Sequence, residues 1–217
     1  YVSLEPCSHF GKTPPCADLI VNKGFKKVVI GMTDPFAKVK GRGIKKLFEN
    51  GCQVIVGVCE NQCMELNKRF ITFHEKQRPY VILKWAASKD GFLSPFEYGK
   101  SEEHEPVWLT NAYSKQLVHQ WRAEEQAILV GTHTALMDNP SLTTRLWEGS
   151  HPIRVLIDKD LKVPQSAQIF SEDAKTLVFT KKQPDISKSN IEYSEIDFGR
   201  NIIPQLLRAL YKRNIQS

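Results

Sequence analysis

The sequence predicts an α/β fold in which helices cover parallel β-sheets. Short β-rich runs, such as the one at 127–131, alternate with helical patterns along the chain. Strands that are separated by single helices favour parallel pairing through right-handed crossovers. A charged cluster at 76–80, which includes Pro79, ends the first series of alternating strands and helices, and a second series follows it. We therefore predict two α/β domains, at 1–77 and 78–217.

The first predicted domain contains three strands and three helices. Gly24 closes the first helix, because glycine readily adopts the left-handed conformation that ends helices. In the last helix apolar side chains recur at spacings typical of one amphipathic face, at Cys63, Leu66, Phe70 and Phe73. We predict strands at 1–6, 26–32 and 52–58 and helices at 16–24, 43–51 and 60–76.

The second predicted domain opens with a β-rich run at 79–91, which turns at Asp90 and Gly91. The polar, irregular stretch at 92–106 is predicted to be a loop. After one helix, strands are predicted at 127–131, 152–158, 176–180 and 191–197, and a last helix at 202–214.

The first helix of this second domain is predicted at 110–126. Thr110 or Asn111 is a plausible cap, because both side chains accept hydrogen bonds from the free amides of a first turn. Tyr113, Leu117 and Trp121 follow four residues apart and therefore share one face. We assign these three side chains to the core.

The composition limits the class of protein. In 217 residues the apolar runs are far shorter than the roughly 20 residues that a membrane-spanning helix needs. No basic segment followed by an apolar one indicates a signal peptide. The five cysteines all lie in the first third of the chain, which favours reduced thiols or metal ligands over a disulfide framework. We expect a cytoplasmic protein with no membrane partner.

The net charge of +6 belongs to the first domain. Residues 1–78 carry 13 Lys and Arg against 7 Asp and Glu, whereas residues 79–217 carry 17 of each. A basic surplus suits nucleic acid, a phosphorylated small molecule or a solvated surface. The chain lacks the interleaved basic and aromatic residues that support RNA binding, so we expect no nucleic-acid partner.

We expect the chain to be part of a longer protein. It begins with Tyr1 instead of Met, inside a strand-to-helix connection. It stops at Ser217 directly after a predicted helix, where an α/β domain would be expected to add another strand. Both predicted domains would then be incomplete.

The stretch EPCSHFGKTPPC, at 5–16, places two cysteines around a loop. A catalytic zinc needs three N or S ligands and one open position for water. Cys7 and Cys16 can supply two thiolates, and the positive end of the helix that starts at Cys16 would favour the thiolate form. The usual deaminase signature has two residues between its cysteines and not eight. From these residues alone, a zinc site and a loop with incidental thiols both remain open.

The same stretch resembles the deaminase motif of the bifunctional riboflavin-biosynthesis deaminase/reductases, the RibD or RibG family, in which the long Cys-x8-Cys loop is characteristic. Further landmarks of that family follow in the same order, and the resemblance covers nearly the whole chain. They are GRG at 41–43, LNKRF at 66–70, KWAASKDG at 84–91, VWLTN at 107–111, the run from LVHQWRAEE to LTTR at 117–145, and PIRVLID at 152–158.

For the first domain the resemblance implies the C-terminal part of a cytidine-deaminase-like α/β/α domain that uses Zn2+. Cys7 and Cys16 match two zinc ligands. The third ligand, a His, and the catalytic Glu of the family would lie upstream of Tyr1, so no catalytic acid or base is assigned here. His9, Lys12 and Asp34 match substrate-binding positions. Phe36 stands where many relatives have Asn, so one polar contact to the pyrimidine is not expected.

For the second domain the resemblance implies an incomplete dihydrofolate-reductase-like domain that uses NADPH. The positions that match the cofactor side are Ala86, Trp108, Thr134, Asp138 and Lys159. Those that match the substrate side are Lys84, Arg122, Leu142 and Arg145. Basic groups there suit a ribose phosphate. The family's Glu-Gly-Gly segment would lie beyond Ser217.

The activity that the resemblance implies has two steps on a small phosphorylated pyrimidine. Zinc-dependent deamination of 2,5-diamino-6-(5-phosphoribosylamino)pyrimidin-4-one would come first. NADPH-dependent reduction of the ribosyl to a ribityl side chain would follow. The family also implies a homo-oligomer formed through the reductase domain of the full-length protein. Because both sites would be incomplete, we expect the 217-residue chain to be inactive by itself.

Other interpretations compete with this one. Cys59 and Cys63 could complete a structural zinc site with Cys7 and Cys16, although the apolar helical face around Cys63 favours ordinary packing. A nucleic-acid deaminase and a reductase with a decayed deaminase portion are the other rivals. Without the resemblance, Trp108 would be assigned to the core. The remaining histidines have no ligand spacing and are expected at the surface or behind a site: His104, His119, His133 and His151.

Overall fold

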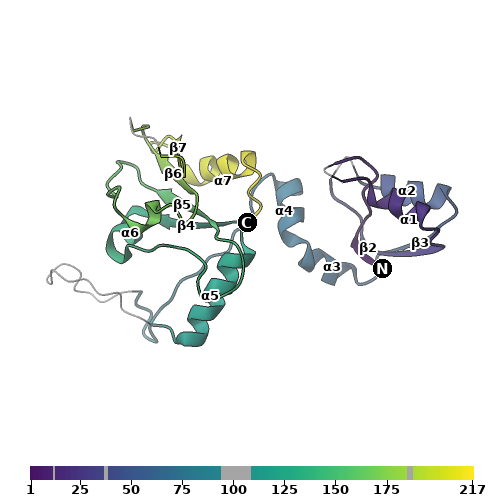
Figure 1. Cartoon of the computed structure of the whole chain (residues 1–217), viewed down its shortest axis with the longest axis horizontal. Helices are drawn as coiled ribbons and strands as arrows, with labels where there is room; N and C mark the ends of the chain where they lie inside the picture. The colour runs from purple at the N-terminus through teal and green to yellow at the C-terminus, as the bar shows by residue number, and fades with distance from the viewer. Residues whose placement is uncertain (12, 37–38, 94–108, 185–187) are drawn as a thin grey trace. The chain divides into compact units, whose positions relative to one another are not determined.

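The computed structural model describes residues 1–11, 13–36, 39–93, 109–184 and 188–217. They form two compact units, Tyr1–Tyr80 with Gln216 and Val81–Ile215 with Ser217. Each unit contains one sheet, and every strand pair in both sheets is parallel. The predicted α/β fold with parallel sheets is confirmed, and Figure 1 shows helices packed beside the strands of each unit.

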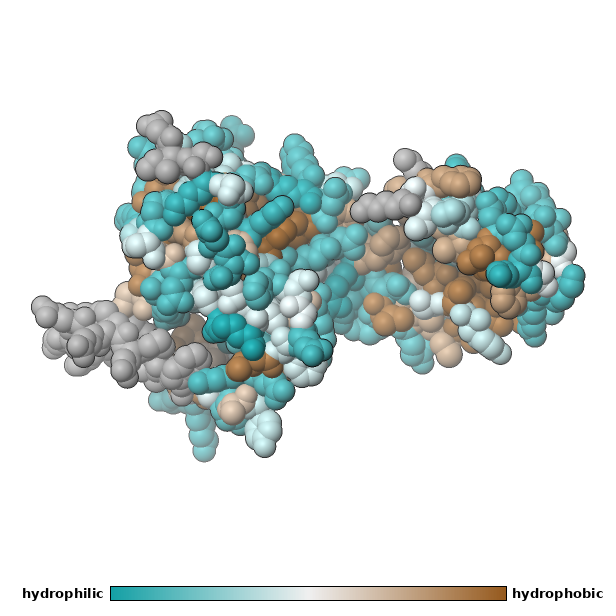
Figure 2. All heavy atoms as spheres, in the orientation of Figure 1, coloured by the Kyte–Doolittle hydropathy of each residue, from teal (hydrophilic) through white to brown (hydrophobic). Residues whose placement is uncertain are grey.

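The N-terminal unit has a three-stranded sheet in the order β1-β2-β3. Its core forms where α1 and α2 cover β2, at Ala17, Val28, Ile30, Leu47 and Cys52. Brown atoms in Figure 2 show that apolar residues also reach the surface of this unit. Its elements are β1 (Val2–Leu4), α1 (Cys16–Asn22), β2 (Lys27–Met32), α2 (Arg42–Glu49), β3 (Gln53–Val56), α3 (Glu60–Leu66) and α4 (Lys68–Lys76).

The single helix predicted at 60–76 is two helices, so that prediction was wrong. Asn67 lies between α3 and α4 and leaves the helical conformation, with φ −98° and ψ 13°. Its side-chain amide donates to the Cys63 carbonyl at 2.8 Å, which satisfies a carbonyl that the helix end would leave free. A side chain on the neighbouring Gly31 would collide with the Cys63 sulfur. Cys63 is therefore closely packed against β2.

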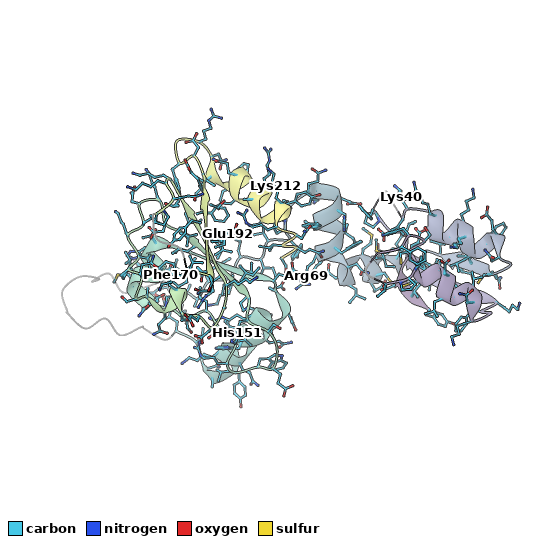
Figure 3. All side chains as sticks on the ribbon, turned by 45° about the horizontal axis from the view of Figure 1, so that its top comes forward. Lys40, Arg69, His151, Phe170, Glu192 and Lys212 are labelled. Carbon is cyan, nitrogen blue, oxygen red and sulfur yellow. The ribbon has the colours of Figure 1, made fainter. Side chains whose placement is uncertain are left out.

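The C-terminal unit has a four-stranded sheet in the order β4-β5-β6-β7. Arg213, directly after α7, donates to Glu192 of β7 at 2.8 Å, and Figure 3 labels Glu192 and the last helical residue, Lys212. The elements of the unit are α5 (Ala112–Glu124), β4 (Ala127–Gly131), α6 (Thr132–Asp138), β5 (Ile153–Ile157), the 3-10 turn η1 (Gln168–Phe170), β6 (Thr176–Thr180), β7 (Ile191–Glu195) and α7 (Ile202–Lys212).

Successive residues of β5 and β6 point to opposite faces of this sheet, and each face has its own core. On one face Val155, Leu177 and Phe179 pack with Leu206 and Leu210 of α7. The other face is covered by α6 and η1, and its core comprises Ala135, Leu142, Leu156, Ile169, Phe170 and Val178, among others. The sheet is thus covered on both sides, as parallel sheets usually are.

Arg154 is the largest fully buried side chain of the described residues. Its guanidinium donates to the carbonyls of Ser171 at 2.5 Å and Gln168 at 3.3 Å, and also to the carbonyl of Ala174. A further contact reaches the Ser141 carbonyl at 3.5 Å. Burial lowers the pKa of Arg154, while Asp173 raises it. The buried cation therefore joins the loop after α6 to the loop before β6.

The strand predicted at 79–91, at the start of the C-terminal unit, was wrong. No strand forms at 79–91, where Val81, Leu83 and Trp85 are exposed, although Gly91 does close a turn onto the Ser88 carbonyl at 3.0 Å. A strand needs a ladder of backbone hydrogen bonds to a neighbouring strand, whereas the Tyr80 amide makes a single such bond, to the Gln216 carbonyl at 2.8 Å. Most of the predicted loop at 92–106 falls outside the described residues.

The face of α5 that was predicted to be core is exposed. Tyr113 is 83% exposed, Leu117 43% and Trp121 39%. The helix instead buries its opposite side, where His119 is only 6% exposed. His119 was expected near the surface or behind a site, and the structure buries it. Along the described helices, none is long and apolar enough to cross a membrane.

Candidate functional site

The two cysteines of the opening motif lie beside each other. Cys7 follows β1 and is half-buried, and Cys16 is the first residue of α1. The Cys16 amide donates to the Cys7 sulfur at 3.3 Å, and the Ala17 amide donates to the Cys7 carbonyl at 3.0 Å. The long loop therefore closes on itself and brings both sulfurs to the amino end of α1.

The pKa of the Cys16 thiol shifts in the direction opposite to the one that the sequence predicted. Burial raises the pKa of Cys16, and a hydrogen bond to Cys7 and its charge raise it further. The lower pKa predicted for a thiol at the helix end is therefore outweighed, mainly by burial and then by the neighbouring sulfur. Two thiols that lie beside each other fit as two ligands of one cation, because a bound metal displaces the thiol protons. Within the described part of the chain, no group of three or more His, Cys, Asp or Glu side chains could hold a metal ion.

Glu5, the first residue of the motif at 5–16, is a buried carboxylate that was not predicted to be a site residue. One carboxylate oxygen accepts from the amides of Gly43 at 3.0 Å and Ile44 at 3.2 Å, in the first turn of α2. The other accepts from Gly41 at 2.9 Å and Asp34 at 3.3 Å. α2 has no side-chain cap of its own, so Glu5 caps it from β1.

Asp34 lies at the carboxyl end of β2 and is buried. Its carboxylate accepts from the Phe36 amide at 2.7 Å. Burial raises the pKa of Asp34, and the charge of Glu5 adds to this rise, whereas the Phe36 hydrogen bond, His74 and His9 lower it. These causes place His9, Glu5 and His74 around one carboxyl group.

An aromatic cluster covers this carboxyl group. The Phe36 ring lies 4.7 Å from the His74 ring and 6.4 Å from the His9 ring, between centroids. His74 also contacts Phe70, with 4.4 Å between centroids. The Phe36 ring thus contacts the rings of both histidines. Lys12, the remaining substrate-side prediction in this unit, lies outside the described residues.

In the C-terminal unit, the structure brings two predicted arginines together. Arg122, on α5, donates from Nη1 to the Thr143 carbonyl at 3.0 Å. Arg145 donates to the Thr143 hydroxyl at 2.8 Å and to the Ser141 hydroxyl. Burial lowers the pKa of Arg122, and the charge of Arg145 lowers it further. The guanidiniums are therefore near enough to repel each other.

These two cations have unused hydrogen-bonding capacity. Within the described parts of the chain, no ion pair joins Arg122 or Arg145 to a carboxylate. The Arg122 Nε atom is buried without an acceptor. A buried donor without an acceptor costs about 1–3 kcal/mol, and an anion that bridges both guanidiniums would satisfy it. The arrangement fits a phosphate or a similar oxyanion.

The loop that carries Arg145 is held by neighbours that the sequence did not indicate as site residues. The Arg145 amide donates to Nδ1 of the buried His119 at 2.8 Å. The Thr144 amide donates to Nδ1 of His151 at 3.2 Å, and Figure 3 labels His151 in this unit. Leu142, a predicted substrate-side residue, is buried with φ +55°, a left-handed conformation that is uncommon for leucine.

The predicted cofactor side is more dispersed. Thr134 and Asp138 lie one turn apart on α6 and are exposed, and Lys159 follows β5. Lys159 lines a cavity of about 620 Å3 at the carboxyl ends of β5, β6 and β7, together with Lys181, Glu195, Ile196, Asp197, Phe198, Gly199 and Gln205. Ligands of parallel α/β folds commonly bind at this edge.

The structure shows little about three other predicted site residues. Lys84 is exposed and Ala86 is half-buried, and both lie in the run at 79–91 that forms no strand. Trp108 lies outside the described residues. The fold and the arginine pair together define a class, the parallel α/β proteins with a basic cradle for a small anionic ligand.

Comparison with known proteins assigns the family. Residues 79–217 match the family described as the RibD C-terminal domain, and the chain belongs to it. The chain is 43% identical to riboflavin biosynthesis protein RibD of Aquifex aeolicus over 84% of its length, and 40% identical to that of Bacillus amyloliquefaciens over its whole length. It spans only 50% and 59% of these two relatives.

Solved structures agree with this assignment. The chain is similar to a diaminohydroxyphosphoribosylaminopyrimidine deaminase/5-amino-6-(5-phosphoribosylamino)uracil reductase of Thermotoga maritima, with a TM-score of 0.86 and 40% identity. The match covers 99% of this chain and 58% of that one. Acinetobacter baumannii RibD gives a TM-score of 0.83 at 31% identity, over 97% of this chain and 58% of its own.

Proposed function

We propose that the C-terminal unit contributes to an NADPH-dependent reductase of riboflavin biosynthesis, which reduces the ribosyl side chain of 5-amino-6-(5-phosphoribosylamino)uracil to a ribityl side chain. The observation that carries the proposal is the arginine pair, whose members lack carboxylate partners among the described residues. The family assignment supports the proposal. The name of the Thermotoga maritima relative, which includes a 5-amino-6-(5-phosphoribosylamino)uracil reductase, supports it as well.

In this proposal the chain's own residues hold the two reactants. Arg122 and Arg145 bind the substrate phosphate, and Lys84 and Leu142 contact the substrate. Bound NADPH supplies the hydride that is added to C1′ of the opened ribose. Binding the remote phosphate fixes the reacting carbon relative to the nicotinamide, and such positioning is a major source of rate enhancement.

The cofactor-side residues of this proposal are Ala86, Trp108, Thr134, Asp138 and Lys159. Of these, Lys159 has the clearest support, because it lines the cavity at the carboxyl edge of the sheet. Its ammonium also lies 6.0 Å from the centroid of the Phe198 ring. At such a site the ammonium can bind a nucleotide phosphate, and the aromatic ring beside it can contact the base. Activity is expected of the longer protein and not of the 217-residue chain.

The reductase proposal is tested in a chimera, in which these 217 residues replace the matching segment of the Bacillus amyloliquefaciens relative. We expect the chimera to oxidise NADPH with the phosphorylated substrate, measured by nicotinamide absorbance. Arg122→Gln and Arg145→Gln should each lower kcat/KM by about tenfold to a hundredfold, because each removes a charge-assisted hydrogen bond. Arg208→Gln, on α7, is the matched control. Unchanged kcat/KM in both site variants would contradict the proposal.

We propose a second function for the N-terminal unit, as part of a zinc-dependent deaminase that acts on the pyrimidine before the reduction. The observation that favours it is the contact between Cys16 and the Cys7 sulfur. Cys7 and Cys16 would hold the zinc, and His9, Lys12 and Asp34 would contact the substrate. Bound zinc supplies an activated water for attack on the amino-bearing carbon.

Zinc content of the same chimera tests this second proposal. Cys7→Ser and Cys16→Ser should each reduce bound zinc, measured by atomic absorption, because each removes one of few ligands. The Cys59→Ser/Cys63→Ser double variant is the control and should keep its zinc. Loss of zinc from the control would favour the structural site that uses all four cysteines.

The partners remain part of the proposal. We expect a small phosphorylated pyrimidine as the substrate and a homo-oligomer formed through the reductase domain. Sedimentation of the chimera measures the oligomeric state. A monomer at all concentrations would contradict this part alone and would leave the proposed chemistry standing.

A further inference from the structure

We propose that His119 is a positioning residue for the arginine pair: its neutral imidazole holds the backbone of Arg145 in the anion-binding position, so that anion affinity falls when His119 is protonated. The inference rests on the proposed phosphate site. His119 does not contact the anion in this proposal; it acts through Arg145. The residue therefore links the pH of the medium to the geometry of the substrate site.

The hydrogen bond determines the tautomer of His119. Its Nδ1 accepts from the Arg145 amide at 2.8 Å, and the side chain is only 6% exposed. An accepting Nδ1 carries no proton, so the neutral ring holds its proton on Nε2. This bond joins α5 to a loop residue that is 26 positions away in the sequence.

The same bond anchors the side chain that would meet the anion. Arg145 is exposed and long, so many orientations are open to it unless its backbone is held. From the held backbone the guanidinium turns back to the hydroxyls of Ser141 and Thr143. Arg122, three residues after His119 on α5, reaches the Thr143 carbonyl at 3.0 Å. The helix α5 thus carries Arg122 and, through His119, also holds the backbone of Arg145.

The charges around the imidazole oppose its protonation. Burial is the main cause that lowers the pKa of His119, and Arg122 on the same helix and Arg145 on the loop lower it further. His151 accepts from the adjacent Thr144 amide, and Glu148 is a further titratable group of this loop. A proton on Nδ1 would place two N–H donors against each other. The loop must then leave the imidazole, and Arg145 loses its fixed position.

Sulfate binding tests the proposal, because sulfate is tetrahedral and keeps both negative charges at mildly acidic pH. Its dissociation constant is measured calorimetrically on the 217-residue chain at a series of pH values from about 7.5 to about 4.5, because burial and the two arginines lower the pKa of His119 below the usual histidine value. The matched variant is His119→Asn, whose side-chain oxygen can take the place of Nδ1 but does not titrate. The ratio of wild-type to variant affinity removes the general effect of protein charge.

We expect this ratio to fall about threefold to tenfold from about pH 7.5 to the acid end of the series, the loss that corresponds to one hydrogen bond. His119→Ala has no acceptor and should bind sulfate more weakly than wild type at pH 7.5. His151→Asn should keep the wild-type pH dependence. Wild-type pH dependence in His119→Asn, or its loss in His151→Asn, would overturn the proposal.

A second measurement separates this inference from the phosphate site itself. The NMR shift of the Arg145 amide, without sulfate, should follow the titration of His119 and become pH-independent in His119→Asn. An amide that does not titrate overturns the positioning role even if sulfate binds. If the amide titrates but Arg122→Gln and Arg145→Gln bind sulfate as wild type does, the phosphate site fails, and with it the effect of His119 on affinity.

Discussion

Glu5 illustrates how one buried side chain can organise a site without belonging to it. Its carboxylate accepts hydrogen bonds from four backbone amides, which lie in the turn after β2 and at the start of α2. Pro6 and Cys7 follow directly, so the residue that caps α2 also fixes the entry to the cysteine loop. The only sequence signal was a charged residue at the end of an apolar strand, which by itself does not separate a cap from a catalytic acid.

At this residue we predict that Glu5→Gln lowers the free energy of unfolding by about 2–3 kcal/mol. The glutamine amide group must face two N–H donors in either orientation, which leaves buried donors unsatisfied. Urea unfolding followed by circular dichroism measures the change. Glu49→Gln, which removes an exposed carboxylate 3.8 Å from Lys45, should change stability by no more than about 0.5 kcal/mol. Equal effects of both substitutions would contradict the capping role.

At the scale of elements, α5 is the helix on which the anion site depends. It carries Arg122 and His119, and its first turn is capped by Asn111, whose side chain accepts from the Ser114 amide at 2.9 Å. The cap was one of two that the sequence predicted. The buried face was not predicted correctly, because Tyr113, Leu117 and Trp121 satisfy the helical spacing whether or not anything covers them.

We predict that Asn111→Ala destabilises the C-terminal unit by about 1 kcal/mol, since the first turn loses its only side-chain cap. Asn111→Asp should restore most of this loss, because aspartate caps equally well and adds a favourable charge at the helix start. Thermal unfolding monitored by circular dichroism gives the difference. Gln116→Ala, in the exposed middle of α5, is the control. A larger loss in the control than in Asn111→Ala would rule out the cap as the cause.

For the whole molecule, the half-buried His74 and the buried His119, one in each unit, connect stability to pH. Burial lowers the pKa of His74 below its usual value of 6.5, and Asp34 partly offsets this. Burial and two arginines lower the pKa of His119. In the unfolded chain both residues bind protons as pH falls below about 6.5, whereas in the folded chain they resist protonation. Stability contributed by the neutral rings is therefore lost as pH falls.

We predict that the midpoint of thermal unfolding is nearly constant above about pH 7 and falls from about pH 6.5 to pH 5. Asp34 acts in the opposite direction, because burial raises its pKa and so favours the folded state at low pH. The comparison is therefore made with the His74→Asn/His119→Asn double variant, which should have a flatter profile. Parallel wild-type and variant profiles would refute the assignment.

Much of the architecture follows from local pattern. The strands at β2, β4, β5 and β6 coincide with short runs rich in Val, Ile and Leu, and the glycine at position 24 closes α1 with φ +69° as predicted. Such features depend on residues that are close in the sequence. The division into domains at 77 and 78 and the individual site roles remain predictions, because they depend on groups that the described residues do not include.

The sequence by itself determined the alternation of strands and helices, the parallel sheets and, through the motif at 5–16, the resemblance to the RibD family. The tertiary structure alone decided which polar groups meet: the Glu5 carboxylate with the amides of α2, the His119 ring with the Arg145 amide, and the Arg122 guanidinium with the Thr143 carbonyl. The physical reason is that periodicity reports only on neighbours along one element. Burial and hydrogen-bond partners depend instead on loops that return over distances such as 26 and 38 residues.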